Sequence, residues 1–288
     1  MGTDCVLHLY AESAGLAEEA FEAVADEVWR IEAKYSRYRD DSFLSEMNRA
    51  AAAGQLALDP ETSGLMSYAL ACHRKSGGVF DITSGLLRKA WDFGSGRLPD
   101  QAEIDVLLPR IGMEKLVWLP PNLAFSIAGM ELDFGGLGKE YAADQAAAVC
   151  ANLGIVAGMI NLGGDIQVLG PHPDGEPWQI HILHPRQAGK LLATISLQRG
   201  ALATSGDYER FMEIDGRRYC HLLDPTTGWP VQGLASVSVV AGQCLVAGSV
   251  STIAMLKQAG GTGWLRETGL DHLWVDGMGG QGGTLSAP

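Results

Sequence analysis

The chain has few cysteines and no long apolar run. Its 5 cysteines are scattered over 288 residues without a C-x-x-C pair, so neither a disulfide framework nor a zinc site is indicated. No apolar stretch approaches the ~18 to 20 residues that span a bilayer, and the opening MGTDCVLHLY has no export-signal pattern. We therefore expect no membrane insertion and a cytoplasmic location, or a periplasmic one if an export signal was removed.

Basic residues are also scarce. The 21 Lys and Arg against 34 Asp and Glu give a formal charge of -13, which argues against nucleic acid and anionic membranes as partners. A phosphate ligand would need a helix N-terminus, a placed cation or a metal ion. No like-charge block, linker or repeat divides the chain, which predicts one folded domain over residues 1–288.

The hydrophobic pattern changes along the chain. Near the N-terminus it predicts a strand over 5–10 and helices over 16–35, 42–50 and 60–77. From Lys115 onward it predicts mainly strands, starting with a hairpin over a Pro-Pro-Asn turn. Helices are predicted there only near Lys139 and over 245–256. Strands in series with few helices between them favour an α+β protein.

One glycine turn has the composition of a phosphate site. LDFGGLGKEYAADQAAAV, residues 132–149, is a predicted strand that runs into a glycine turn and then an Ala-rich helix. Such a junction presents free backbone N–H groups and permits close approach of a ligand. The spacing matches neither the Walker loop nor G-x-G-x-x-G, so a phosphate cradle and a purely structural turn both stay open.

Three other stretches place polar side chains beside turns. Asp81 in GGVFDITSGLL precedes an apolar helix, where helix capping is the structural alternative. Asp165 in NLGGDIQVLG follows a glycine turn, where an Asx-turn is common. His221 in YCHLLDPTTGWPV ends a predicted strand, where a structural histidine is more common than a catalytic one.

The predicted helix LVAGSVSTIAML carries no charge. On a 3.6-residue period its Gly248, Ser251, Thr252 and Met255 share one stripe. A small, hydroxylated stripe is typical of a core helix that packs closely, or of a helix placed against a ligand.

Taken in order, seven stretches resemble the ApbE-like FAD:protein FMN transferase family, from the N-terminus to about Lys257. They are SRYRDDSFLSEMN, GGVFDITSGLL, LDFGGLGKEYAAD, NLGGDIQVLG, ALATSGDYERF, HLLDPTTGWPV and the uncharged helix. The resemblance implies an α+β, T-fold-like architecture, with a mixed sheet and flanking helices. It also implies an enzyme that cleaves FAD with Mg²⁺, transfers FMN to a threonine of an acceptor flavoprotein and releases AMP.

The resemblance further implies site residues. The positions that match the family's FAD contacts are Met1, Tyr38, Val79, Phe80, Asp81, Asp133, Lys139 and Leu222. His221 is the expected general base, with Asp165 a weaker candidate. The expected magnesium ligands are the Gly136 carbonyl and Thr252, with Ser251 able to lend a hydroxyl.

The chain departs from the family at the metal site. The family's magnesium-binding Asp falls on Gly248, and no Asp or Glu occurs between Ala241 and Gly263. A neutral oxygen does not replace a carboxylate for Mg²⁺, although Asp165 or Asp224 could supply one. Two alternatives to a transferase therefore stay open: an FAD-binding carrier, sensor or partner without transfer, and a pyrophosphatase that yields FMN and AMP. On this alignment we expect Gly248→Asp to strengthen Mg²⁺ binding.

Overall fold

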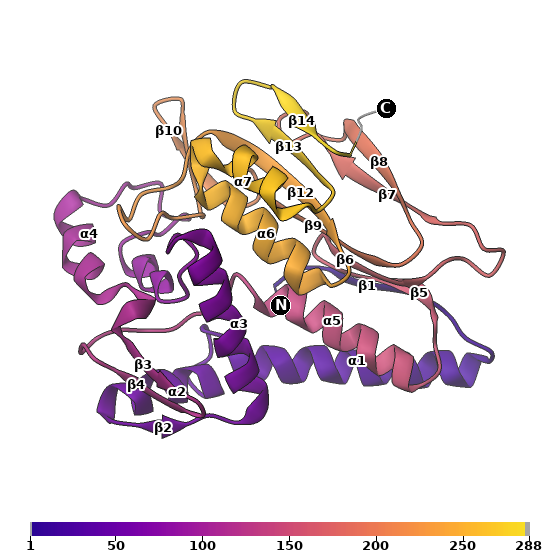
Figure 1. Ribbon diagram of the computed structural model, residues 1–288, viewed down its shortest axis with the longest axis horizontal. Helices are drawn as coiled ribbons and strands as arrows, with labels where there is room; N and C mark the ends of the chain where they lie inside the picture. Colours follow the sequence, from indigo (N-terminus) through magenta and orange to yellow (C-terminus); the bar gives the residue numbers. More distant parts are fainter. Residues whose placement is uncertain (1, 286–288) are drawn as a thin grey trace.

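A seven-stranded sheet lies at the centre of the computed structural model, which describes residues 2–285 (Figure 1). In spatial order its strands are β1 (Cys5–Tyr10), β5 (Ala157–Leu162), β6 (Asp165–Gly170), β9 (Gly200–Gly206), β12 (Leu234–Ala241), β13 (His272–Asp276) and β14 (Gln281–Gly283). Every neighbouring pair is antiparallel. The α+β prediction is confirmed, but the sheet is antiparallel rather than mixed, because its strands follow hairpins or long excursions that return in the opposite direction.

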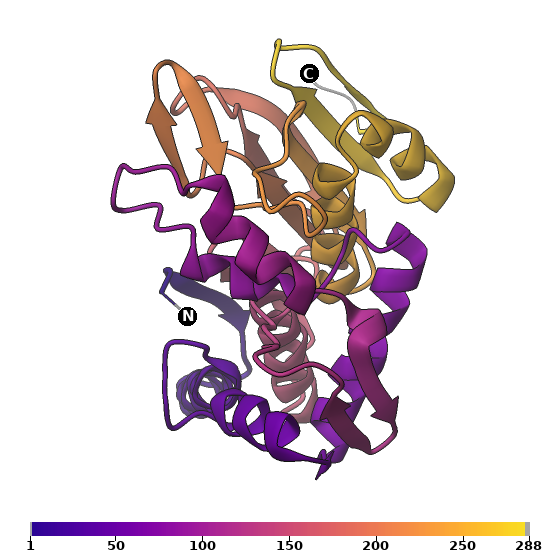
Figure 2. The same ribbon diagram turned by 90° about the vertical axis from the view of Figure 1, so that its left-hand side faces the viewer.

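Helices cover one face of this sheet. The two with the most extensive contacts to it are α5 (Gly138–Asn152) and α6 (Cys244–Leu256). Behind them lie α1 (Ala14–Tyr35) against α5, and α3 (Pro60–Ser76) and α7 (Gly261–Thr268) against α6 (Figures 1 and 2). The uncharged sequence of α6 follows from this position, because a helix enclosed by a sheet and other helices has no face for charged side chains.

The opposite face of the sheet carries a ribbon of two strands, β7 (Trp178–Leu183) and β8 (Leu191–Leu197). Its inward side chains form a separate core with β6, β9, β12 and β13. As a result β6 is buried at every position, which is typical of a strand covered on both faces.

Smaller elements complete the end of the molecule that holds α3. They are α2 (Phe43–Ala53), β2 (Leu56–Ala57), η1 (Ser84–Lys89), α4 (Gln101–Leu107), η2 (Leu108–Arg110), η3 (Met113–Lys115), β3 (Leu116–Leu119), β4 (Asn122–Phe125), β10 (Phe211–Ile214), β11 (Arg217–Cys220) and η4 (Gln258–Gly260). Several predicted helix ends and one predicted turn are confirmed. Ser42 caps α2, and Gly77 ends α3 at a φ of 72°. Asp215 and Gly216 turn between β10 and β11 with φ values of 51° and 73°.

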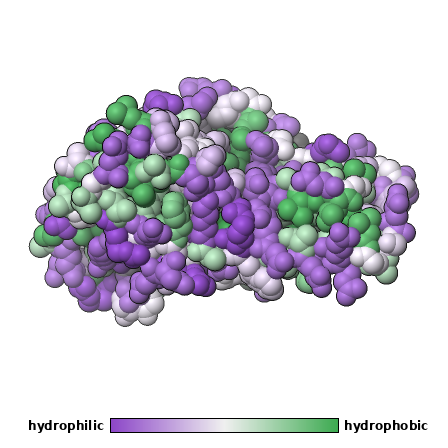
Figure 3. Space-filling model, turned by 90° about the horizontal axis from the view of Figure 1, so that it is seen from below, coloured by the Kyte–Doolittle hydropathy of each residue, from purple (hydrophilic) through white to green (hydrophobic). Residues whose placement is uncertain are grey.

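The surface seen from below is mostly hydrophilic, with separate apolar groups (Figure 3). The helix α1, which runs along this side in Figure 1, leaves Phe21 and Trp29 exposed at 58% and 65%. Within residues 2–285, none of the helices combines the length and the apolar character that crossing a membrane requires.

Candidate active site

Lys139 and Asp165 form a half-buried ion pair beside the predicted glycine turn. Lys139 is the second residue of α5, and Asp165 begins β6 and is only 3% exposed. Burial acts to lower the pKa of Lys139, but the negative charges of Asp165 and Glu140 outweigh it and raise that pKa. Burial also raises the pKa of Asp165, against the opposing effect of Lys139. The site therefore holds one fixed cation at the start of α5.

Glu140, which the sequence analysis did not single out, is the neighbouring buried carboxylate. It is 6% exposed, and its Oε2 has no hydrogen-bond partner within the described part of the chain. Burial, followed by the charge of Asp165, raises the pKa of Glu140 to about 8. A buried carboxylate oxygen without a partner is costly, so this group requires an explanation.

The side chain of Glu140 lies directly against Gly248 of α6. A Cβ atom built on Gly248 would be 2.4 Å from Glu140 Cγ and 2.7 Å from Glu140 Oε1. The expectation that Gly248→Asp strengthens Mg²⁺ binding requires free space at this position, and the Glu140 side chain fills that space.

The rest of the small-residue stripe on α6 is bound to the sheet. Ser251 Oγ and Thr252 Oγ1 lie 2.8 Å and 2.9 Å from Ser205 Oγ of β9. Ser251 also donates to the Gly248 carbonyl at 2.9 Å. At the start of α6, Asp144 of α5 accepts two backbone hydrogen bonds of 2.7 Å and 2.9 Å. Close packing and polar contacts thus coexist on this helix.

The glycine turn is organised by Asp133 and Arg37. Asp133 pairs with Arg37 and accepts a hydrogen bond of 2.8 Å from Gly135 N. Arg37 also donates to the Tyr38 hydroxyl at 2.8 Å. A Cβ on Gly136 would lie 3.8 Å from the Phe80 ring, so the structure brings four predicted positions, 38, 80, 133 and 136, around one turn. The predicted Met1 lies outside the described residues.

Asp81 has a local structural role. Its carboxylate accepts hydrogen bonds from Thr83 N at 2.7 Å, Thr83 Oγ1 at 2.6 Å and Met113 N at 3.0 Å. His73, Asp81 and Glu114 also offer ligand atoms within 4.8 Å of one another. Asp81 already accepts three hydrogen bonds and Glu114 is exposed. This group is therefore a weaker candidate for a metal site than the pair of Asp165 and Glu140.

His221 is held as a neutral imidazole. Its Nδ1 lies 3.2 Å from the Arg210 carbonyl, and because a carbonyl only accepts, Nδ1 carries a proton. In the neutral imidazole Nε2 then keeps its lone pair. Burial lowers the pKa of His221; the hydrogen bond to the Arg210 carbonyl opposes this shift, and the positive charges of Arg210, Lys139 and Arg37 add to it. The adjacent Leu222 packs against the main core.

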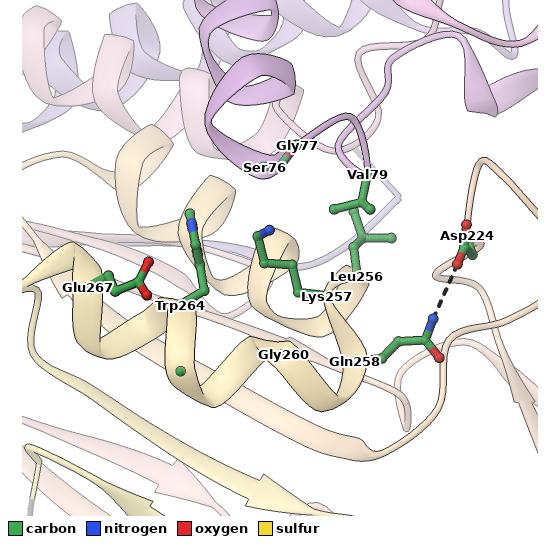
Figure 4. Close-up of a pocket in the computed structure, with 11 residues that line it drawn as sticks. Ser76, Gly77, Val79, Asp224, Leu256, Lys257, Gln258, Gly260, Trp264 and Glu267 are labelled. Carbon is green, nitrogen blue, oxygen red and sulfur yellow. Dashed lines mark hydrogen bonds between the residues drawn. The ribbon is translucent and has the colours of Figure 1, made fainter.

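The larger of the two described hollows is lined by none of Lys139, Asp165 and His221. A cleft of 550 Å³ separates the end of α3 from α6, η4 and α7, and Val79 is the predicted FAD-contacting residue that lines it (Figure 4). Asp224 also faces this cleft, where it accepts hydrogen bonds from Gln258 and Thr226. These bonds occupy both of its carboxylate oxygens, so Asp224 is a poor candidate for a metal ligand.

A glycine turn that opens a helix, with a lysine in the first turn of that helix, can bind a phosphate-bearing ligand through backbone N–H groups and a charge-assisted hydrogen bond. Comparison with known proteins is specific: a model described as the ApbE family matches residues 1–274, and the chain belongs to the ApbE family.

Its relatives support the same placement. The chain is 32% identical over 228 residues to the FAD:protein FMN transferase of Vibrio cholerae serotype O1, across 77% of this chain and 68% of the relative. It is 30% identical over 288 residues to that of Treponema pallidum, across 90% of this chain and 80% of the relative. The crystal structure of the ApbE protein from Thermotoga maritima matches with a TM-score of 0.89 and 28% identity, covering 98% and 94% of the two chains. The apo Pseudomonas stutzeri flavinyl transferase ApbE matches at 0.87 and 28%, covering 99% and 92%. The flavin transferase architecture is confirmed.

Proposed function

We propose that this protein is an FAD:protein FMN transferase. It cleaves the pyrophosphate of FAD, joins the FMN phosphorus to a threonine oxygen of an acceptor flavoprotein and releases AMP. The observation that carries the proposal is the cluster of Lys139, Asp165 and neutral His221 beside the glycine turn, in a chain that belongs to the ApbE family.

The site residues fit the demands of this reaction. Lys139 and the N–H groups of the turn at 135–138 would neutralise pyrophosphate charge. His221 Nε2 would accept the proton of the threonine hydroxyl as its oxygen bonds to phosphorus. The phosphoanhydride bond then breaks, and AMP leaves with the bonding electron pair.

The remaining predicted residues would hold the FAD. Tyr38, which is 74% exposed, presents a free ring face, and Phe80 borders the glycine turn. The other proposed contacts are Met1, Val79, Asp81, Asp133 and Leu222. Among these, Asp133 and Asp81 act by fixing the turn and the backbone before η1, since their carboxylates are already engaged.

Magnesium is part of the proposal. When bound, Mg²⁺ would neutralise the charge that develops on the departing phosphate. Gly136, Ser251 and Thr252 would offer neutral oxygens, and the unpartnered Oε2 of Glu140 supports the proposal because a carboxyl oxygen is a hard donor suited to such an ion.

The missing acid at residue 248 favours a binding protein without transfer as the second candidate. This argument is weakened because the carboxylate of Glu140 lies where a side chain at 248 would be. A pyrophosphatase that gives FMN and AMP is the third candidate.

One assay separates the three. Incubation with FAD, MgCl₂ and a flavinylation-type acceptor domain should release AMP and leave covalent flavin fluorescence on the acceptor, but not on an acceptor whose target Thr is replaced by Val. AMP without labelled acceptor would identify the pyrophosphatase. Retained FAD binding with neither product would identify the binding protein.

We also propose that residues 1–288 act as one domain, because one core joins α1 to α6 and α7. Limited proteolysis should then yield no stable fragment of half length. The proposed compartment is the cytoplasm, with the periplasm as the alternative, and cell fractionation decides between them.

A further inference from the structure

We propose that Glu140 of α5 supplies the carboxylate ligand of a divalent-cation site that α6 itself does not provide. The inference rests on the proposed function, because the cation would serve the same pyrophosphate. It concerns a residue that neither the sequence analysis nor the comparisons assign to metal binding.

The first support is that a side chain of α5 fills the space left beside a glycine of α6. A Cβ on Gly248 would stand 2.4 Å from Glu140 Cγ, 2.7 Å from Oε1 and 2.9 Å from Cδ. The carboxylate of Glu140 therefore reaches the face of α6 at Gly248, one helical turn before Thr252. Helix α6 lacks a carboxylate at this place, and Glu140 of α5 supplies one there.

The second support is the unsatisfied state of that carboxylate. Glu140 is 6% exposed, and its Oε2 makes no hydrogen bond among residues 2–285. The nearest cation in sequence, Lys139, is already paired with Asp165, whose own side chain is buried. Glu140 therefore has no cation of its own, and a bound divalent cation would supply one and stabilise its ionised form.

The neighbouring oxygens are of the kind that hard cations prefer. Thr252 Oγ1 and Ser205 Oγ lie 2.9 Å apart on α6 and β9, and hydroxyl oxygens complete the coordination of such ions alongside carboxylates. The group of His73, Asp81 and Glu114 is the rival site, and the test must distinguish the two.

The test measures metal binding directly, with MnCl₂ as the probe. Free Mn²⁺ is counted by electron paramagnetic resonance, with and without FAD, for the full-length protein. We expect the wild type to bind one Mn²⁺ and Glu140→Gln to bind it at least ~10-fold more weakly, because the change removes a charged ligand but keeps the shape. Glu114→Gln, the matched control in the rival site, should bind as the wild type does.

A swap of the two positions gives a second arm that does not depend on the behaviour of Glu140→Gln. The double variant Glu140→Gly, Gly248→Asp returns the carboxylate to α6 and should recover Mn²⁺ affinity to within ~10-fold of wild type. Gly248→Asp alone should bind no better than wild type, because its carboxylate meets Glu140. Circular dichroism confirms that each variant is folded.

Three results would overturn the inference: no Mn²⁺ binding by the wild type, unchanged binding in Glu140→Gln, or loss of binding in Glu114→Gln alone. AMP release from FAD, measured on the same samples, keeps this test separate from the proposed function. AMP release together with unchanged Mn²⁺ binding in Glu140→Gln overturns the inference only. Binding of Mn²⁺ through Glu140 without AMP release overturns the function only.

Discussion

The contact between Glu140 and Gly248 predicts an unusual effect of Gly248→Ala. In an unobstructed helix this change stabilises a protein by about 1 kcal/mol. Here the new Cβ would meet Glu140 Cγ at 2.4 Å, roughly 1 Å inside an ordinary carbon–carbon contact. Overpacking of a well-filled site costs about 1–3 kcal/mol, and Glu140 is too deeply buried to move aside freely. We therefore expect Gly248→Ala to lower the free energy of unfolding by about 1 or 2 kcal/mol.

A double-mutant cycle tests this reasoning. In a Glu140→Ala background the obstruction is gone, so Gly248→Ala should now stabilise by about 1 kcal/mol, which gives a coupling energy of about 2–3 kcal/mol. Urea denaturation followed by far-UV circular dichroism measures each corner of the cycle. Gly64→Ala is the matched control, because Gly64 lies within α3 and a Cβ there meets no atom within 4 Å. If Gly248→Ala stabilises the wild type as much as Gly64→Ala does, Glu140 does not fill the space at Gly248.

Three further predictions concern the helices and the base. Asp144→Ala removes both hydrogen bonds to the start of α6 and should cost about 1–2 kcal/mol in urea denaturation; Asp144→Asn, which keeps one acceptor, should cost less. Burial raises the pKa of Glu61, but hydrogen bonds from Arg30 and Lys34 outweigh it and lower that pKa to about 2. The stabilisation from this carboxylate, about 1 kcal/mol after allowance for its partial exposure, is therefore complete above the ordinary pKa of 4.5 and lost as the pH falls towards 2. The stability difference between wild type and Glu61→Gln should shrink over that window, and a difference independent of pH would contradict the assignment. His221→Asn should slow AMP release by roughly 10²–10⁴-fold while leaving FAD affinity nearly unchanged, and an equal loss of FAD affinity would make His221 a binding residue instead.

Local signals predicted much of the fold. The helices α1, α2, α3, α5 and α6 were all expected, because apolar periodicity, Ser42 and Pro60 at starts and Gly77 at a stop act within a few residues. The helix α4 carries a capping box of Asp100 and Glu103 that the sequence analysis passed over, although the signal was present. The elements α7, β13 and β14 lie beyond Lys257, where the resemblance ended, and they were missed. Strand order and direction depend on contacts between distant segments, which is why the sheet was wrongly expected to be mixed.

Part of the site could be predicted in the same way. Lys139 and Asp165 were both named as candidates, and they meet because the glycine turn starts α5 beside the first residue of β6. Arg37 was missed because nothing in its neighbourhood in the sequence points to Asp133, to which it is paired. That pairing exists only after α1 and the glycine turn have been brought together by folding.

Glu140 illustrates why an unfavourable substitution should not be judged on one helix. A Glu at the third position of a helix is ordinarily a solvent-exposed partner of the helix dipole, and a Gly in a later helix ordinarily reflects close packing. Taken alone, Glu140 attracts no attention, and Gly248 indicates the loss of a metal ligand. Together they form one contact. Gly248 leaves the room in which the Glu140 side chain is buried, and Glu140 brings to this place the carboxyl group that α6 lacks. The absence of a carboxylate on α6 therefore does not show the loss of metal-dependent transfer, since a carboxyl group can reach that place from α5 as well as from α6.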